Sequence, residues 1–344
     1  MIKKKIYRIG VVFLTIVSLS GLTSCNDWLD VKPKTEEEAA SLFATLDGFK
    51  SALAGCYIGL CQPELYGREL TYGMVGVLGQ EWGKGATLDN SYTAYSYLQN
   101  YNYEQSASKV LIDQAWNKMY ESVANVNTLI EYTELKKEVL GDYYAVVRGE
   151  ALAMRAYIHF DLLRLFAPSY KADPGYTAIP YITKYSNKVS PQKTVSEVID
   201  SVIVDLKAAV TDLEGRDPIF DPLYQATTGS DMYMWTQPMP DRNEFLSYRG
   251  FRLNYYAVNA LLARVYAYKL DKKQAYDYAK IVLESGVFKF TDYWKITSDI
   301  QYRNRILRPE IVFGFNVPRM TKVFEPYSPS YSSSKKWLTI KNSE

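Results

Sequence analysis

The sequence predicts a mostly α-helical protein with helical hairpins, long irregular loops and little β structure. Apolar residues recur at steps of three and four along much of the chain, which is the spacing of one helix face. Of the 344 residues, 47% are hydrophobic and 23% are charged, values typical of a chain that folds around a core. Stretches rich in Gly, Pro and Tyr interrupt the helical segments and are expected to be loops.

The first 24 residues have the features of a signal peptide. Basic residues between Lys3 and Arg8 precede a 12-residue apolar run, Val11–Leu22, which is too short to span a membrane as a helix. The following Leu22-Thr23-Ser24-Cys25 resembles the lipobox at which bacterial lipoproteins are cleaved and acylated. An ordinary secretory signal that happens to precede a cysteine is the alternative. We expect residues 1–24 to be removed, Cys25 to carry the lipid and residues 25–344 to form a single domain.

Charge and rare residues exclude several kinds of function. Removing the four basic residues of the leader from 40 leaves 36 Lys and Arg against 38 Asp and Glu, a net charge of about −2. A near-neutral protein has no electrostatic basis for binding nucleic acid. The single histidine, His159, lies in an apolar helical stretch, so we expect a packed rather than a catalytic residue. With no glycine-rich phosphate loop and no cluster of metal ligands, we expect no cofactor and no metal.

Two cysteines remain after Cys25. Cys56 and Cys61 are five residues apart in a helical stretch, which separates them by roughly 140° around the helix axis. That placement disfavours a bridge, so buried free thiols are expected, with a disulfide in an oxidising compartment as the alternative.

Helical segments are predicted in order along the first half of the chain. Asp47–Cys61 is followed by the Gly-, Tyr- and Ser-rich stretch Tyr66–Gln105, which is predicted as loops and turns. Helical spacing returns at Leu111–Ile130. The strongest helix, about Tyr143–Phe166, is apolar on two faces and should be packed on two sides until Pro168 ends it.

The second half begins with a helix-start signal. Thr194-Val195-Ser196-Glu197 is a capping box that begins an amphipathic helix. Residues 215–250 lose periodicity and collect prolines and aromatic residues, which indicates a second long loop of the kind that often carries function. A hairpin of two helices, Leu253–Lys269 and Lys273–Ser285, follows, and Ile311–Phe315 is predicted as a strand.

The hairpin has the spacing of a tetratricopeptide repeat. Ala263 and Ala275 lie 12 residues apart, where small side chains let two helices approach closely, and the Tyr266 ring is placed to fill the groove beside them. The segments Ala151–Tyr157 and Ala260–Tyr266 share the pattern Ala-Leu-x-x-Arg-x-Tyr, which indicates a repeated unit.

Four segments, in order, resemble motifs of the SusD/RagB family of nutrient-binding outer-membrane lipoproteins. They are the opening Cys25–Pro33, the Glu-Ala-x-x-x-Arg-Ala-Tyr helix at Glu150–Tyr157, the amphipathic helix Val198–Leu213 and the Ala-Arg-x-Tyr hairpin Ala260–Gly286. The resemblance covers the chain from Cys25 to about Asn316. Family members continue with a Tyr-Ala-Glu-Ala-type helix and an Arg-rich segment that nothing here matches, so the chain is expected to lack the family's C-terminal part.

The resemblance implies a SusD-like helical fold in a protein that is lipid-anchored at the outer membrane and faces the cell exterior. It implies capture of oligosaccharides, or of another nutrient such as peptides, and delivery to a SusC-like, TonB-dependent transporter. A helical lipoprotein glycosidase is one alternative, and a scaffold that binds no ligand but holds other surface proteins is a second. Because no catalytic motif is present, we expect a binding protein rather than an enzyme.

Aromatic residues of the predicted loops and later segments are the candidates for sugar contact. A sugar site needs flat aromatic faces for the CH-rich side of a pyranose, with amide or carboxylate groups for its hydroxyls. The candidates are Trp82, Tyr92, Tyr95, Trp235, Tyr293 and Trp294. Packing is the alternative for each of them. Glu150 and Arg155 lie in a helix that is apolar on two faces, so we expect paired structural charges rather than catalytic groups.

Overall fold

The computed structural model describes residues 34–82, 93–185, 188–221, 244–297 and 307–324. The chain divides into two compact units, Met1–Ala44 and Thr45–Glu344. The first unit contains helix α2 (Lys34–Leu42) among its described residues. The other described elements belong to the second unit, which carries the core and the candidate site.

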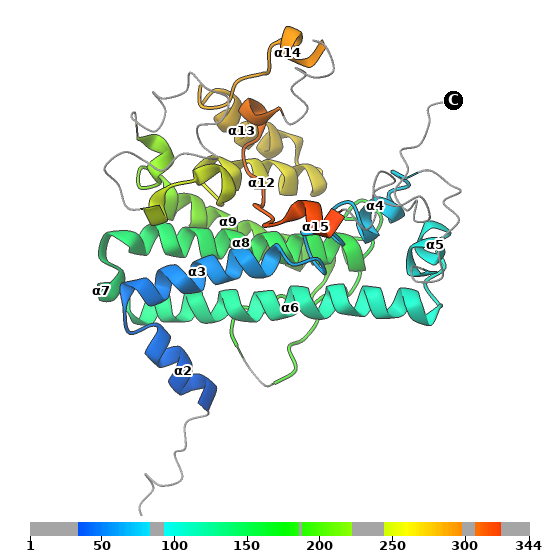
Figure 1. The fold of residues 1–344 in the computed structure, drawn as a ribbon, viewed down its shortest axis with the longest axis horizontal. Coiled ribbons are helices and arrows are strands. Elements are labelled where there is room, and N and C mark those ends of the chain that lie inside the picture. Colours follow the sequence, from blue (N-terminus) through cyan, green and yellow to red (C-terminus); the bar gives the residue numbers. More distant parts are fainter. Residues whose placement is uncertain (1–33, 83–92, 186–187, 222–243, 298–306, 325–344) are drawn as a thin grey trace, which may run out of the picture. The chain divides into compact units, whose positions relative to one another are not determined.

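Long helices packed against one another build the second unit (Figure 1). In chain order they are α3 (Leu46–Leu60), α6 (Ser106–Leu135), α8 (Tyr144–Phe166), α9 (Val195–Leu213), α12 (Tyr255–Tyr268) and α13 (Lys272–Leu283). From α6 to α13, successive helices of this series pack against each other, and α3 packs against both α6 and α8. The expected mostly α-helical fold is confirmed.

Helix α8 lies at the centre of this core. Both of its predicted apolar stripes are buried, because α3, α6 and α9 all pack against it. At Gly149, α8 and α9 approach closely, since a Cβ atom at this position would lie 2.8 Å from Cγ of Leu213. Any larger residue there has to push the Leu213 side chain aside.

Polar caps fix where the helices begin. At the start of α9, the Thr194 hydroxyl accepts from the backbone N–H of Glu197 at 3.2 Å, and the Glu197 carboxylate accepts from the N–H of Thr194 at 2.8 Å. This is the predicted capping box. Asn254 and Asp271 cap α12 and α13 through their side-chain oxygens.

The α12–α13 hairpin closes over a short polar turn in which Leu270 has a positive φ of 68°. The Tyr266 ring of α12 stacks on the Tyr278 ring of α13, with centroids 5.5 Å apart and planes at 7°. An aromatic ring therefore fills the groove between the paired helices, as the repeat spacing predicts.

The stretch Tyr66–Gln105 is more helical than expected. Two short helices lie within it, α4 (Met74–Leu78) and α5 (Thr93–Gln99), so the prediction of loops and turns alone was wrong. Their buried residues, among them Val77 and Leu98, come in runs too short to display a helical period.

The predicted strand Ile311–Phe315 was also wrong. It makes one backbone hydrogen bond to a distant segment, from the N–H of Gly314 to the carbonyl of Gly250 at 3.1 Å, and no ladder forms among the described residues. Its apolar side chains pack in an aromatic cluster instead, where the Phe315 ring stacks on Tyr66 with centroids 4.7 Å apart.

Short elements connect the long helices. They are α7 (Lys137–Leu140), η3 (Gly141–Tyr143), η4 (Pro218–Phe220), η5 (Glu244–Leu246), η6 (Arg249–Phe251), α14 (Tyr293–Thr297), η7 (Arg308–Glu310) and α15 (Met320–Phe324). An isolated antiparallel bridge joins Thr177 to Thr194, so β structure is minor in the described part of the chain.

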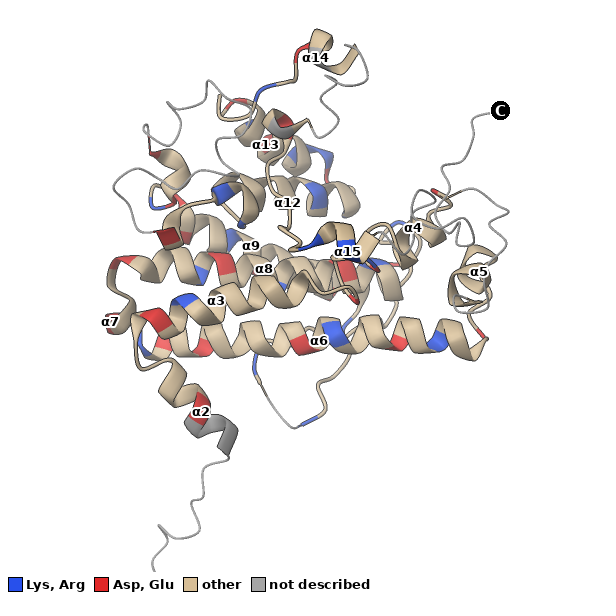
Figure 2. Ribbon diagram, in the orientation of Figure 1, with Lys and Arg blue, Asp and Glu red and all other residues tan. Residues whose placement is uncertain are grey.

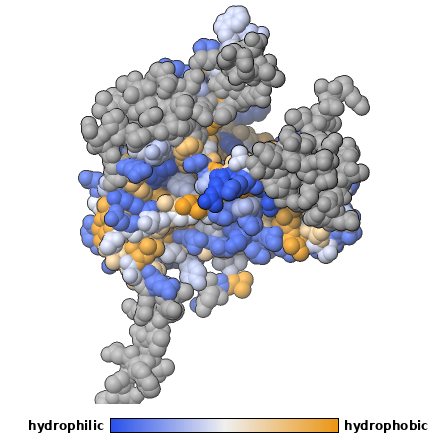
Figure 3. All heavy atoms as spheres, viewed as in Figure 1, coloured by the Kyte–Doolittle hydropathy of each residue, from blue (hydrophilic) through white to orange (hydrophobic). Residues whose placement is uncertain are grey.

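The surface is mixed in charge and polarity. Basic and acidic residues both occur along α6 (Figure 2), in keeping with the near-neutral composition. On the face drawn in Figure 3, hydrophobic residues occur in small areas among hydrophilic ones wherever the chain is described. No helix in the described ranges combines the length and apolarity needed to cross a bilayer.

Candidate functional site

Two of the predicted sugar-contact residues lie beside α4. Trp82 is half-buried, and its Nε1–H donates to the carbonyl oxygen of Tyr72 at 2.8 Å. Tyr95, on α5, is only 7% exposed, and its hydroxyl donates to the buried carboxylate of Glu69 at 2.8 Å. The Tyr95 ring is therefore enclosed, whereas part of the Trp82 indole faces outward.

Tyr293 and Trp294 form a second aromatic pair, on α14. Their side chains are 68% and 78% exposed, and their ring centroids are 5.7 Å apart. Figure 1 draws α14 well apart from α4 and α5, so the structure does not bring the two pairs together. Cys25, Tyr92 and Trp235 lie outside the described residues.

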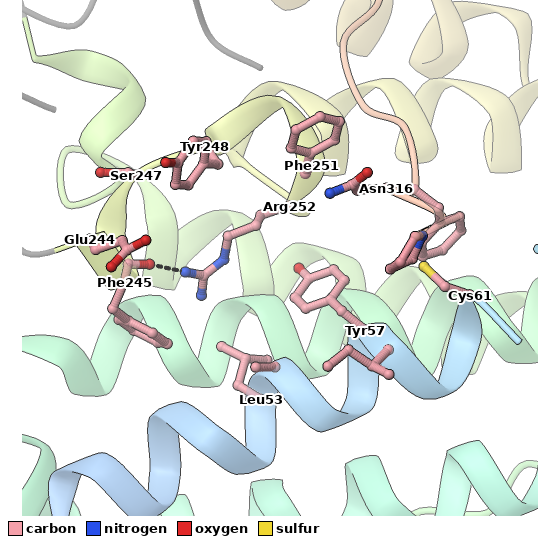
Figure 4. Close-up of a pocket in the computed structure, with 14 residues that line it drawn as sticks. Leu53, Tyr57, Cys61, Glu244, Phe245, Ser247, Tyr248, Phe251, Arg252 and Asn316 are labelled. Carbon is pink, nitrogen blue, oxygen red and sulfur yellow. Dashed lines mark hydrogen bonds between the residues drawn. The ribbon is translucent and has the colours of Figure 1, made fainter. Parts of the chain in front are cut away.

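An open cavity of about 760 Å³ lies between α3 and the segment 244–252 (Figure 4). Its size falls within the range of small-molecule sites. Five aromatic side chains line it: Tyr57, Phe245, Tyr248, Phe251 and Phe315. We refer to it as the α3 cavity.

Polar side chains are available in the lining of the α3 cavity. Glu244 and Asn316 are exposed and Tyr248 is half-exposed, and within the described residues no side-chain hydrogen bond occupies them. They offer a carboxylate, an amide and a phenol, which together supply both donors and acceptors. Apolar walls with a few free polar groups are the usual composition of a ligand pocket.

A buried charge cluster holds the segment 244–252 in place. Arg249 is fully buried, and its Nε and Nη2 each donate to one oxygen of Asp217 at 2.8 Å. Its Nη1 donates to Glu150 at 2.6 Å. Arg252 donates from Nε to the other Glu150 oxygen at 2.9 Å. We call Glu150, Asp217, Arg249 and Arg252 the buried charge cluster.

Tyr57 joins the opposite wall of the cavity to the same carboxylate. Its hydroxyl donates to Glu150 at 2.7 Å and accepts from the N–H of Leu253 at 2.8 Å. Burial acts to raise the pKa of Glu150, but Arg252 and Arg249 outweigh it and hold that pKa below its usual value. Burial, with the nearby Glu150 charge, raises the pKa of Tyr57. Glu150 therefore stays ionised and Tyr57 stays protonated at neutral pH.

Arg252 mainly stabilises the conformation of its own segment, residues 244–252. Its Nη1 donates to the carbonyl oxygen of Phe245, and its guanidinium carbon lies 4.4 Å from the centroid of the Phe245 ring. Nη2 is buried and makes no hydrogen bond to any described residue. The guanidinium thus lies against an aromatic ring rather than projecting freely into the cavity.

A second buried cluster contains the single histidine. Arg155 forms a fork with Asp205, donating at 2.7 and 2.8 Å, and also donates to Asn127 at 3.0 Å. His159 is fully buried, with Nδ1 2.9 Å from the Arg155 carbonyl oxygen and Nε2 accepting from the N–H of Ile182 at 3.0 Å. Burial lowers the pKa of His159 to about 4. The expectations of a packed histidine and of paired structural charges are confirmed.

Cys56 and Cys61 are buried and form no disulfide, so the expectation of free thiols is confirmed. Burial raises the pKa of Cys56 to about 12 and that of Cys61 to about 11, which keeps both thiols protonated. Within the described ranges, no three or more His, Cys, Asp or Glu side chains are placed to hold a metal ion.

The α3 cavity contains none of the residues that the sequence suggested for sugar contact. A usable signal was present, because Phe245–Arg252 alternates aromatic residues with arginines at the end of the second predicted loop. The ion pair that anchors this segment could not be predicted from the sequence, since Glu150 and Arg249 are 99 residues apart in the chain.

Comparisons with known proteins identify relatives. A family model for SusD-like proteins, described as starch-binding and associating with the outer membrane, matches residues 27–218. A SusD-like protein of Formosa agariphila is 25% identical over 217 residues, which are 61% of this chain and 38% of that relative. The chain therefore spans well under half the length of this relative.

Solved structures agree with the fold. A SusD superfamily protein from Bacteroides thetaiotaomicron is 24% identical with a TM-score of 0.53, covering 73% of this chain and 48% of that one. Another, from Bacteroides fragilis, is 17% identical with a TM-score of 0.58, covering 80% and 56%. The family model covers more than half of the chain, and the helical architecture matches that of the solved structures, so this protein belongs to the SusD-like family.

Proposed function

We propose that this protein is a lipid-anchored outer-membrane protein that captures oligosaccharides at the cell exterior and delivers them to a SusC-like, TonB-dependent transporter. Membership of a family described as starch-binding and associating with the outer membrane carries the proposal. The lipobox ending at Cys25 and the open, aromatic-lined α3 cavity support it. One structural relative, from Bacteroides vulgatus, is itself described as a SusD-like carbohydrate-binding protein.

Capture without hydrolysis fits the environment of Glu150, the buried carboxylate that anchors the cavity wall. A glycosidase needs a carboxylic acid with a raised pKa as proton donor and a second carboxylate across the bond that breaks. Glu150 is held ionised by two arginines, with its pKa lowered instead of raised. This environment suits a structural anion and opposes proton donation.

The aromatic residues suggested by the sequence remain proposed ligand contacts. Of these candidates that the structure describes, Tyr293 and Trp294 are the most exposed, and Trp82 is half-buried. Tyr95 would contribute indirectly, by fixing α5 through its hydrogen bond to Glu69. Tyr92 and Trp235 complete the proposed set.

Three measurements on the full-length lipoprotein test the proposal. Radiolabelled palmitate should be incorporated into the wild type, and both label and membrane retention should be lost in Cys25→Ala. Isothermal calorimetry of the detergent-purified protein against neutral and acidic oligosaccharides should find binding without release of reducing ends. A TonB-dependent transporter should co-purify from the outer membrane.

Different results would exclude different parts of the proposal. Retention of the label in Cys25→Ala would exclude this lipidation site. Release of reducing ends would favour the glycosidase. A transporter that co-purifies with a folded protein lacking affinity for every oligosaccharide would favour the scaffold.

A further inference from the structure

We infer that the α3 cavity holds one neutral sugar ring of the captured glycan and discriminates against acidic saccharides. The inference rests on the proposed function and goes further by assigning the contact residues and the charge class of the ligand. Three features of the cavity carry it: its aromatic walls, its unoccupied polar groups and its balance of charge.

The walls suit the apolar faces of a pyranose. Figure 4 places Phe251 and Tyr248 on one side and Tyr57, on α3, facing them across the cavity. A pyranose ring presents C–H groups on its faces, which pack on aromatic rings, while its hydroxyls project around its edge. About 760 Å³ accommodates such a ring with the start of its neighbours in the chain.

The free polar groups match hydroxyls better than any single ion. A hydroxyl both donates and accepts, and Glu244, Tyr248 and Asn316 together provide both functions. Because these side chains make no hydrogen bond to other described residues, a ligand would displace water from them without breaking a hydrogen bond within the described part of the chain. The backbone of Tyr248 is held in the left-handed region at φ 57°, a conformation that ordinary residues keep mainly where packing or function demands it.

Charge balance disfavours an acidic ligand. The two arginines of the buried charge cluster are matched by its two carboxylates, with contacts of 2.6 to 2.9 Å, so the cluster adds no net charge. Lys50, whose ammonium lies 5.9 Å from the Phe245 ring centroid, is paired with Asp47 at 3.2 Å. Glu244 is left as the uncompensated charge among the described lining residues, and it repels a uronate or sulfate group.

The test compares one neutral and one acidic probe on the full-length lipoprotein. Calorimetry would use maltoheptaose and a galacturonate heptasaccharide with the wild type, Glu244→Gln and Asn316→Ala. Glu131→Gln is the matched control, because Glu131 is exposed on α6 and makes no contact with the cavity lining. Hydrogen exchange of residues 53–61 and 244–252 with and without maltoheptaose reports where the ligand lies.

The expected result is about tenfold weaker maltoheptaose binding in Glu244→Gln and about fivefold weaker binding in Asn316→Ala, each from the loss of hydrogen bonds to hydroxyls. The wild type should bind the galacturonate heptasaccharide at least about tenfold more weakly than maltoheptaose. In Glu244→Gln the ratio of the two dissociation constants should be smaller, because the carboxylate that repels the acidic ligand is gone. Glu131→Gln should match the wild type, and maltoheptaose should slow exchange in both segments.

Failures of the inference and of the proposed function give different results. Maltoheptaose binding that is unchanged in both cavity variants, with exchange slowed elsewhere, would overturn the inference and leave the proposed function standing. Galacturonate binding as tight as maltoheptaose binding would overturn the charge preference. A wild type that binds no oligosaccharide of the wider panel would overturn the proposed function and this inference with it.

Discussion

At the residue scale, the charged residues of the Glu150–Tyr157 motif have a structural explanation in this chain. Glu150 accepts hydrogen bonds from Tyr57, Arg249 and Arg252, and Arg155 binds Asp205 and Asn127. One end of the motif therefore anchors the wall of the α3 cavity, and the middle joins α8 to α9 and α6. Both charges are therefore paired within the protein.

The first prediction concerns Arg249. Replacing it by Met leaves Asp217 and Glu150 buried without their shared partner, so unfolding in urea should show a loss of roughly 3–5 kcal/mol. Arg164→Met is the control, because Arg164 is 41% exposed and pairs with Asp161 within one helix. That change should cost about 1 kcal/mol or less. Equal losses in the two variants would contradict the structural role of the buried charge cluster.

The second prediction concerns His159 and pH. Its pKa falls from 6.5 to about 4 on folding, because burial disfavours the charged ring. As the pH falls, the unfolded chain therefore binds this proton before the folded protein does. The free energy of unfolding that is present above pH 6.5 should decrease as the pH falls toward 4, by about 3 kcal/mol in all. His159→Gln should have a flatter stability profile between pH 6.5 and 4.5. Stability profiles with the same pH dependence in the wild type and His159→Gln would exclude His159 as the cause of the loss.

At the element scale, the long helices were predictable and the short ones were not. The helices α8 and α9 carry continuous apolar stripes, and the Thr194 capping box marks where α9 begins. In α4 and α5 the helical run is no longer than seven residues, which is too short for periodicity to register. The segment 311–315 has strand-like composition, but strand formation depends on a partner that its local sequence does not reveal.

The third prediction compares two helical glycines. Gly149→Ala places a Cβ atom 2.8 Å from Leu213 and should lower the free energy of unfolding by about 1–3 kcal/mol. Gly55→Ala on α3 meets nothing within 4 Å and should raise it by about 0.5–1 kcal/mol, because alanine restricts the unfolded chain. Thermal or urea unfolding measures both. A stabilised Gly149→Ala would show that α8 and α9 are less closely packed than described.

At the scale of the whole molecule, the family fold could be predicted from motifs that occur in the family's order along the chain, but the cavity could not. The motifs lie in helices whose neighbours are close in sequence, such as α12 and α13. The α3 cavity draws its walls from residues 53–61, 244–252 and 315–318, which no local pattern relates. The aromatic candidates chosen from the sequence came from predicted loops and later segments, and Tyr95, predicted in a loop, is instead on a short helix and enclosed.

The fourth prediction concerns local stability within the second unit. Because α8 is packed by α3, α6, α9 and α12, its backbone amides should exchange most slowly with deuterium. Exchange should be fast in α14 and α15, which are short and largely exposed. Mass spectrometry of peptic fragments measures this order. A hairpin α12–α13 that stays protected longer than α8 would contradict a core centred on α8.

The Glu150 contacts join residues that are far apart in the chain, and this separation determines when they can form. Tyr57 and Arg249 meet Glu150 across 93 and 99 residues of chain, so this junction cannot form on a nascent polypeptide until synthesis has passed Arg252. Contacts between distant positions also form late in folding, because a long loop must close first. Until then α3 and α8 can form as helices, but Glu150 lacks its arginine partners and the α3 cavity lacks its wall from residues 244–252.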